Sequence, residues 1–467
     1  MTFKEALDII DGLRFAADKL NLRCAPGRNS LMSLRMLTSR EDLEREFLLL
    51  NGAINTLDSA GEQHSVSQII AFLSDVRDIH TTIQRLAGGA TPDDIELFEI
   101  KGLALADGRI KGAIEATALS QYRDLALPDL AAVVEILDPE RNGNAHFHIY
   151  DAYSPDLREA RLTLKHIQDT EGPDSEKAAA QMAECMRLEE EVRTLLGIRL
   201  LPYAGDLQRS LLTIGKIDLL LAKAEMAREL RLTQPKISEG EIKFTGLRFL
   251  PLEEKGAFQP VDITLPRGVT LITGANMGGK TITLRSLALA QALAQFAFFV
   301  PAAEAEVALV ENIALSIGDS QSTLSGLSSY GAEILKIDGI LSEATAGKRM
   351  LILIDEPART TNPEEGKAIV EALIDLLGLT RSFAAVTTHY SNIGSPCRRL
   401  KVRGLRNIPA AEAIVSPGSL QKYMDYTLEP DSGGEVEREA LKIGRMLGIS
   451  EHFADAIEKR NINNSLR

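Results

Sequence analysis

The chain has 467 residues, and its hydrophobic fraction of 45% excludes both a disordered acidic tail and a small disulfide scaffold. Its 52 basic and 66 acidic residues give a formal net charge of −14, of which −11 lies in residues 1–240. Nucleic-acid phosphates attract concentrated positive charge, so this balance disfavours a large general nucleic-acid surface. A chain of this length predicts two or three domains.

The cysteines and the most apolar segment indicate in which cellular compartment we expect the protein. Cys24, Cys185 and Cys397 form no Cys-x-x-Cys pair, so the sequence predicts neither a zinc site nor a disulfide framework and favours the reducing cytoplasm. The amino terminus opens in a charged helical pattern, which predicts no signal peptide. The apolar stretch 287–300 contains two glutamines and is short of the roughly 20 residues that span a bilayer, so we expect no membrane partner.

The pattern of apolar residues divides the chain into two parts. Helical spacing runs through residues 1–130, where strand patterns are nearly absent. Two charged helices are predicted at 158–169 and 176–195, and the break between them makes a short hairpin. From Ile242 the pattern changes to alternating strands, glycine loops and helices, which predicts an α/β domain that begins near residues 238–240.

A glycine-rich loop lies between a predicted strand at 269–273 and a predicted helix at 282–295. Its pattern, Gly-x-x-x-x-Gly-Lys-Thr, is typical of a phosphate-binding loop, because glycines let backbone N–H groups approach phosphates and the helix N-terminus adds its positive dipole. Lys280 would neutralise phosphate oxygens of ATP, and Thr281 would ligate Mg²⁺. A plain glycine turn before a helix is the alternative. The predicted nucleotide-binding residues of this loop are Gly274, Ala275, Asn276, Met277, Gly278, Gly279, Lys280 and Thr281.

Two further predicted strands end in polar residues. The strand at 350–354 is followed by Asp355, which would hold hydrated Mg²⁺, and by Glu356, which would orient or deprotonate the attacking water. Paired acids at this position are otherwise often helix N-caps. The strand at 383–387 leads to His389, which is either a structural histidine or a sensor of the γ-phosphate.

These motifs resemble those of the MutS family, the ABC-type ATPases of DNA mismatch repair. Residues 273–281 are similar to the family's Thr-Gly-Pro-Asn-Met-Gly-Gly-Lys-Ser/Thr loop, and residues 317–322 look closest to the branch that usually carries a carboxy-terminal Smr nuclease domain. The resemblance implies an α/β ABC-type P-loop ATPase domain, preceded by an all-α core and lever domain. The implied segments are a helical core at 1–155, a shortened lever hairpin without a clamp at 156–195, returning core helices at 196–240, and the ATPase domain with carboxy-terminal dimerisation helices at 241–467.

The resemblance also assigns residues to the site. Ser328 corresponds to the signature serine that reaches the ATP bound by the partner subunit, which implies a homodimer or a heterodimer with a paralogue. A helix N-cap is the alternative role of Ser328. Phe258 is either the counterpart of a phenylalanine that stacks on adenine or an ordinary core residue. After Glu356 the family's Leu-Gly-Arg-Gly-Thr becomes Pro-Ala-Arg-Thr-Thr at 357–361, so this subunit-contact loop loses both glycines.

Because several domains of the family are not expected here, the resemblance leaves open which molecule the ATPase acts on, its client. Only 30 residues separate Asp156 from Arg187, too few for the family's clamp, and we expect neither its mismatch-reading domain nor an Smr domain. One hypothesis is a dimeric ATPase of DNA repair or recombination that binds DNA weakly and without mismatch selectivity. The basic residues between 398 and 406 are either a local patch for DNA or, as we favour, an ordinary solvated surface of the ATPase domain. The alternative, which the resemblance to clamp-less members of the family implies, is an ATP-dependent chaperone that reactivates a cobalamin-dependent aminomutase; an acidic, truncated core also suits a protein client. A scaffold with a dead ATPase is disfavoured by the intact catalytic motifs.

Overall fold

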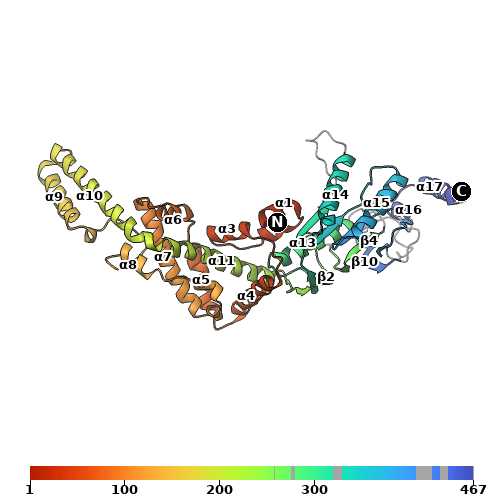
Figure 1. Ribbon diagram of the computed structural model, residues 1–467, viewed down its shortest axis with the longest axis horizontal. Coiled ribbons are helices and arrows are strands. Elements are labelled where there is room, and N and C mark those ends of the chain that lie inside the picture. Colours follow the sequence, from red (N-terminus) through yellow and green to blue (C-terminus); the bar gives the residue numbers. More distant parts are fainter. Residues whose placement is uncertain (257, 275–278, 319–328, 406–422, 432–439, 466–467) are drawn as a thin grey trace. The chain divides into compact units, whose positions relative to one another are not determined.

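The computed structural model describes residues 1–256, 258–274, 279–318, 329–405, 423–431 and 440–465 (Figure 1). The chain divides into two compact units. The α/β unit contains Met1–Lys19, Leu34–Phe47 and Met226–Arg467, and the helical unit contains Leu20–Ser33 and Leu48–Glu225. The four segments that the resemblance implies stay predictions. The mixed α/β fold with a helical amino-terminal part is present as predicted.

The helical unit is built from capped amphipathic helices. Asp93 caps α7 in a reciprocal capping box with Glu96, and Ser154 caps α9 ahead of a proline at the first helical position. These caps satisfy backbone N–H groups that a helix start leaves unpaired. Helices whose residues lie wholly or partly in this unit are α3 (Ala25–Ser33), α4 (Arg40–Asp58), α5 (Gln63–Ser74), α6 (His80–Ala87), α7 (Asp94–Glu115), α8 (Ala131–Leu137), α9 (Pro155–Glu171), α10 (Glu176–Leu200) and α11 (Ala204–Glu229).

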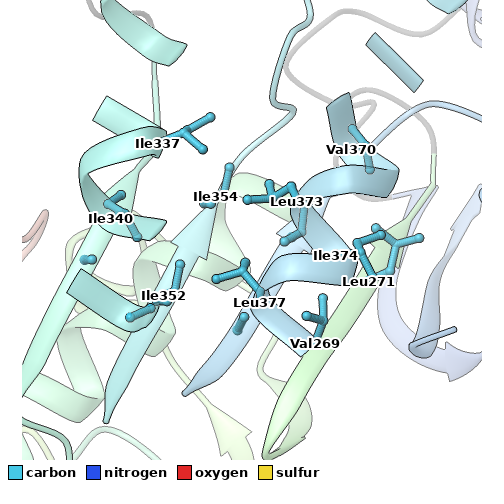
Figure 2. Close-up of a cluster of buried hydrophobic side chains, with 14 of the residues drawn as sticks. Val269, Leu271, Ile337, Ile340, Ile352, Ile354, Val370, Leu373, Ile374 and Leu377 are labelled. Atoms are coloured by element: carbon cyan, nitrogen blue, oxygen red, sulfur yellow. The ribbon is translucent and has the colours of Figure 1, made fainter. Parts of the chain in front are cut away.

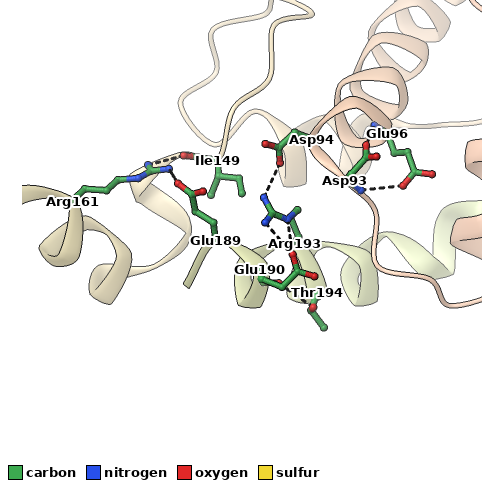
Figure 3. Close-up of polar contacts among 9 residues, drawn as sticks. All are labelled: Asp93, Asp94, Glu96, Ile149, Arg161, Glu189, Glu190, Arg193 and Thr194. Atoms are coloured by element: carbon green, nitrogen blue, oxygen red, sulfur yellow. Dashed lines mark hydrogen bonds and ion pairs between the residues drawn. The ribbon is translucent and has the colours of Figure 1, made fainter. Parts of the chain in front are cut away.

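Helices α9 and α10 lie side by side as a hairpin (Figure 1). Arg161 of α9 donates to the Ile149 carbonyl at 2.8 Å and pairs with Glu189 of α10 at 2.6 Å (Figure 3). Further along α10, Arg193 pairs with Asp94 at the start of α7 at 3.2 Å. These pairs fix the base of the hairpin on the rest of the helical unit.

The described strands of the α/β unit form two sheets. A six-stranded sheet has the order β10-β9-β4-β8-β7-β6, in which β9, β4, β8, β7 and β6 run parallel and β10 runs antiparallel to β9. A four-stranded sheet has the order β1-β5-β2-β3. The strands are β1 (Lys236–Ser238), β2 (Glu241–Leu247), β3 (Val261–Pro266), β4 (Gly268–Thr273), β5 (Glu304–Ala308), β6 (Asn312–Ser316), β7 (Met350–Ile354), β8 (Phe383–Thr387), β9 (Arg398–Leu405) and β10 (Met424–Pro430).

Helices pack on the six-stranded sheet and bury its apolar strands. Every residue of β7 and β8 is buried, which is typical of central parallel strands covered on both faces. Figure 2 shows Ile352 and Ile354 of β7 in one cluster with Ile337 of α14 and Leu373 of α15. The described helices that lie wholly in this unit are α1 (Phe3–Ile9), α2 (Leu13–Asp18), α12 (Leu250–Glu253), α13 (Lys280–Gln295), α14 (Ser329–Thr345), α15 (Pro363–Gly378), α16 (Ala440–Met446) and α17 (Glu451–Ser465).

Amino-terminal residues belong to the α/β unit because they pack on the end of α13. The Phe3 ring lies against Phe296 and Phe298, with centroid distances of 5.1 Å and 6.1 Å. The buried side-chain amide of Gln295 donates to the Leu37 carbonyl at 2.8 Å, and the Leu37 N–H donates back to the Gln295 carbonyl at 2.7 Å. Among the helices that the structure describes, none is both long enough and apolar enough to cross a membrane.

Candidate functional site

Two glycines frame the predicted phosphate loop. Gly279 precedes α13 with φ +75°, and a Cβ there would lie 2.7 Å from the ring of Tyr426. Gly274 follows β4 with φ +138°, and a Cβ there would lie 3.1 Å from Val402. Both positions therefore require glycine, for conformation and for space. Of the predicted loop residues, Ala275, Asn276, Met277 and Gly278 lie outside the described residues.

Lys280 is the first residue of α13, and its side chain is only 4% exposed. Its Nζ donates to the Gly274 carbonyl at 2.6 Å and pairs with Glu356 Oε1 at 3.2 Å. Glu356 is 13% exposed, so this ion pair is largely shielded from water. The helix start adds N–H groups that have no partner within the helix itself, and it adds the positive end of the helix dipole beside the ammonium group. This end of α13 is therefore suited to bind an anion that can replace the Glu356 carboxylate.

Asp355, a predicted magnesium ligand, accepts hydrogen bonds from the other predicted ligand, Thr281 in α13, and from Thr387 in β8. Thr281 Oγ1 donates to Asp355 Oδ2 at 2.6 Å, and Thr387 Oγ1 donates to Asp355 Oδ1 at 2.6 Å. The predicted pair of Thr281 and Asp355 is thus in direct contact. A hydroxyl and a carboxylate are hard oxygen donors of the kind that Mg²⁺ takes in proteins, with phosphate oxygens and waters completing its shell. Within the described residues, no group of three or more His, Cys, Asp and Glu side chains could hold a metal ion.

Glu356 and His389 lie next to each other at the same end of the sheet. Glu356 has φ +46°, and its N–H donates to Thr387 Oγ1 at 2.9 Å. His389 Nδ1 lies 3.9 Å from Glu356 Oε2, and this buried nitrogen has no hydrogen-bond partner in the part of the chain that the structure describes. Lys280, Glu356 and His389 thus converge, although they follow three different strands in the sequence.

The loop after Glu356 contains a contact that the sequence did not indicate. Tyr390 Oη donates to the Ala358 carbonyl at 3.0 Å, and Ala358 has φ +60°. A Cβ at Gly366 would lie 2.1 Å from Tyr390 Oη, so Gly366 makes room for this hydroxyl. Ala358 stands at the first glycine position of the family's loop, which was the only available signal that a left-handed conformation would occur here.

An aromatic residue that the sequence reasoning missed packs on the phosphate loop. The ring of Tyr426, in β10, lies against Gly279, and burial raises the pKa of its hydroxyl. The Tyr426 N–H donates to Gln259 Oε1 at 3.3 Å, and Gln259 Nε2 donates to Asp425 Oδ1 at 3.1 Å. Predicted Phe258 is half-buried next to Gln259. Predicted Ser328 lies outside the described residues.

The arginines of β9 make polar contacts within the α/β unit. Arg398 donates to the Thr264 carbonyl, and Arg399 donates to the Ser395 carbonyl at 3.0 Å. Arg403 pairs with Glu429 and with Asp425. Of these three arginines, only Arg403 has a carboxylate partner among the described residues, so the contacts of Arg398 and Arg399 leave their positive charge in place.

Comparisons with known proteins give the family of this segment. Residues 270–426 match the family described as MutS domain V. The chain is 36% identical over 210 residues to "Endonuclease MutS2" of Levilactobacillus brevis, covering 44% of this chain and 26% of that protein. It is 35% identical over 254 residues to "Endonuclease MutS2" of Carboxydothermus hydrogenoformans, covering 54% and 31%.

A third relative carries a different name. The chain is 34% identical over 297 residues to "DNA mismatch repair protein MutS" of Thermus thermophilus, covering 63% of this chain and 35% of that protein. Each match thus spans between about a quarter and about a third of the relative's own length. The resemblance predicted from the motifs is confirmed: residues 270–426, which include Lys280, Asp355, Glu356 and His389, match MutS domain V, and the relatives carry MutS names.

Proposed function

We propose that this chain is an ATPase that binds ATP with Mg²⁺ at the end of its parallel sheet and hydrolyses the γ-phosphate. The observation that carries the proposal is the convergence of Lys280, the Thr281–Asp355 pair, Glu356 and His389 within a MutS domain V. We further propose that the α/β unit is an ABC-type P-loop domain.

The phosphate group would be held at the start of α13. Lys280 supplies a shielded positive charge, and the backbone N–H groups of Lys280 and Thr281 in the first turn of α13 would supply donors in the direction of the helix dipole. Glu356 pairs with Lys280 in this structure, so ATP binding replaces a carboxylate with phosphate oxygens on the same ammonium group. This exchange frees Glu356 for chemistry in the same step that fills the site.

Thr281 and Asp355 are the proposed magnesium ligands. Their oxygens already meet at 2.6 Å, so both can face one ion after small shifts. Bound Mg²⁺ neutralises charge on phosphate oxygens. Thr387 holds the other Asp355 oxygen by a 2.6 Å hydrogen bond, which keeps the carboxylate facing Thr281.

Glu356 is the proposed general base for the attacking water, and His389 the proposed contact to the γ-phosphate. A base must come within hydrogen-bond reach of the proton that it accepts. Glu356 sits beside Lys280, which places its carboxylate near the position proposed for the terminal phosphate. The buried Nδ1 of His389, which has no hydrogen-bond partner among the described residues, can offer a hydrogen bond there.

The remaining parts of the site concern adenine and a second subunit. Tyr426 packs on Gly279 and is a candidate, with Phe258, to contact the adenine ring. Ser328 of one subunit would reach the ATP bound by the other, in a homodimer or in a heterodimer with a paralogue. Helices α16 and α17 are the proposed dimerisation helices at the carboxy terminus.

DNA is the client that the names of the relatives suggest, since they read "Endonuclease MutS2" and "DNA mismatch repair protein MutS". Two observations limit the affinity that we propose: a net charge of −11 over residues 1–240, and the pairing of Arg403 in β9 with Asp425 and Glu429. We therefore propose weak DNA binding without mismatch selectivity. The same charge favours the second candidate, a chaperone of a protein client such as a cobalamin-dependent aminomutase.

Phosphate release from ATP tests the proposed activity. The unaltered protein should release phosphate, and Lys280→Ala should lose both nucleotide affinity and release, because the shielded ammonium is gone. Lys348→Ala is a matched control, since Lys348 pairs with Glu343 on an exposed part of the same unit. Absence of release by the unaltered protein, or equal release by Lys280→Ala, would overturn the proposal.

A further inference from the structure

The loop that follows Glu356 has a conformation that its residues do not favour by themselves. Glu356 and Ala358 have φ values of +46° and +60°, in the left-handed region that glycine adopts most readily. Ala358 is fully buried, so no water compensates its backbone groups. Hydrogen bonds to the Ala358 backbone are therefore needed to hold this conformation in place.

One of these hydrogen bonds comes from Tyr390, which lies outside the loop. Its hydroxyl donates to the Ala358 carbonyl at 3.0 Å, and the N–H of Thr361 donates to the same oxygen at 3.2 Å. Tyr390 is 9% exposed, and its hydroxyl occupies space that a side chain on Gly366 of α15 would fill, since a Cβ there would lie 2.1 Å away. The Tyr390 hydroxyl therefore fits only because residue 366 has no side chain.

Tyr390 also adjoins the reacting end of the site. It follows His389 directly, and the two rings lie 4.3 Å apart between centroids. Burial and the nearby carboxylates of Glu333 and Glu356 raise the pKa of Tyr390, so its hydroxyl stays protonated and remains a donor. One side chain therefore contacts both the histidine and the loop that begins at Glu356.

We infer that Tyr390 is a positioning residue for ATP hydrolysis: its hydroxyl keeps Ala358 left-handed and so fixes the backbone that presents Glu356. This inference rests on the proposed function, because it assumes that Glu356 acts on water. Tyr390 itself touches neither phosphate nor water in the proposed reaction. Its loss should therefore lower kcat without raising KM for ATP, because Lys280 and Thr281 belong to α13 and not to this loop.

A double-mutant cycle with Ala358→Gly separates this role from general stability. Tyr390→Phe removes one neutral hydrogen bond, for which we expect a drop in kcat of about fivefold. Glycine adopts the left-handed conformation without help, so the same Tyr390→Phe change should cost less than about twofold in the Ala358→Gly background. Tyr153→Phe is the matched control, because Tyr153 Oη donates to the Ile136 carbonyl at the same 3.0 Å in the helical unit; it should leave kcat and KM unaltered.

Hydrogen exchange gives a readout that does not depend on activity. The Thr361 amide, bonded to the Ala358 carbonyl, should exchange faster in Tyr390→Phe and recover its protection in the double variant. Equal kcat in Tyr390→Phe and the unaltered protein, or an equal loss in both backgrounds, would overturn the inference and leave the proposed function standing. No hydrolysis by the unaltered protein would overturn both.

Discussion

Replacement of Glu356 by glutamine separates nucleotide binding from hydrolysis. Glu356 Oε1 lies 3.2 Å from Lys280 Nζ, and both side chains are mostly buried. ATP must displace this carboxylate to reach the ammonium group. Glutamine has nearly the same shape and keeps a carbonyl oxygen as an acceptor, but it has no charge, so it competes less strongly with phosphate.

The size of the effect follows from the kind of bond that is lost. A charge-assisted hydrogen bond is roughly twice as strong as a neutral one, a difference of about 1.4 kcal/mol in net terms. Glu356→Gln should therefore bind ATP about tenfold more tightly than the unaltered protein. Turnover should fall by a factor of about 100 or more, because a general base typically contributes that much.

Two titrations check this prediction. Equilibrium binding of a fluorescent ATP analogue in the presence of Mg²⁺ gives Kd, and phosphate release gives kcat. Glu343→Gln is the control, because Glu343 forms a comparable pair with Lys348 at 3.0 Å on the exposed surface of the same unit. Unchanged or weaker binding by Glu356→Gln would show that this carboxylate does not compete for Lys280. Undiminished turnover would remove Glu356 from its assigned role as base.

Further predictions concern stability, the client and the subunits. Burial raises the pKa of Asp107 to about 6 in the folded protein, above its pKa in the unfolded chain, so the protein loses stability as pH rises through about 6 and the buried carboxyl ionises. Asp107→Asn should therefore stabilise the protein by about 2 kcal/mol at about pH 8 and by almost nothing below about pH 4. Chemical denaturation at both pH values would measure this difference. Asp138→Ala leaves the fully buried Lys101 without its carboxylate and should cost about 3–5 kcal/mol, measured in the same way; a loss below about 1 kcal/mol would contradict this. Matched and single-mismatch duplexes should bind equally weakly at about 150 mM salt, and a tenfold or greater preference for the mismatch would refute the proposed lack of selectivity. Ser328→Ala and Lys280→Ala, each inactive, should regain partial ATPase activity when mixed; heterodimers that form without any recovery would contradict a site shared between subunits.

The sequence indicated those parts of the site that follow strands. Lys280, Asp355 and His389 each come directly after or shortly after a predicted strand, and parallel strands bring their carboxyl ends to one edge of a sheet. The loop pattern and the predicted strands were therefore enough to predict that these residues lie together. Their roles stay predictions.

The parts that the sequence did not indicate depend on packing between distant segments. Tyr426 lies against Gly279, and neither residue carries a local pattern that points to the other. Tyr390 donates to the carbonyl of Ala358, and the left-handed backbone of Ala358 is a property of the folded loop that the sequence around Tyr390 does not indicate. Likewise, the helical spacing around Phe3 predicts a helix but not its contact with Phe296, so no local pattern groups residues 1–19 with the α/β unit.

Magnesium dependence of phosphate release is the most direct test of the central proposal, that the end of this sheet is an ATPase site. ATP would be incubated with the unaltered protein and with Asp355→Asn, each with Mg²⁺ and with a chelator in its place. The account predicts release by the unaltered protein only when Mg²⁺ is present, and a large loss in Asp355→Asn, because Asp355 and Thr281 are the proposed ligands. Release that persists in the chelator, or that is equal in Asp355→Asn, would contradict it.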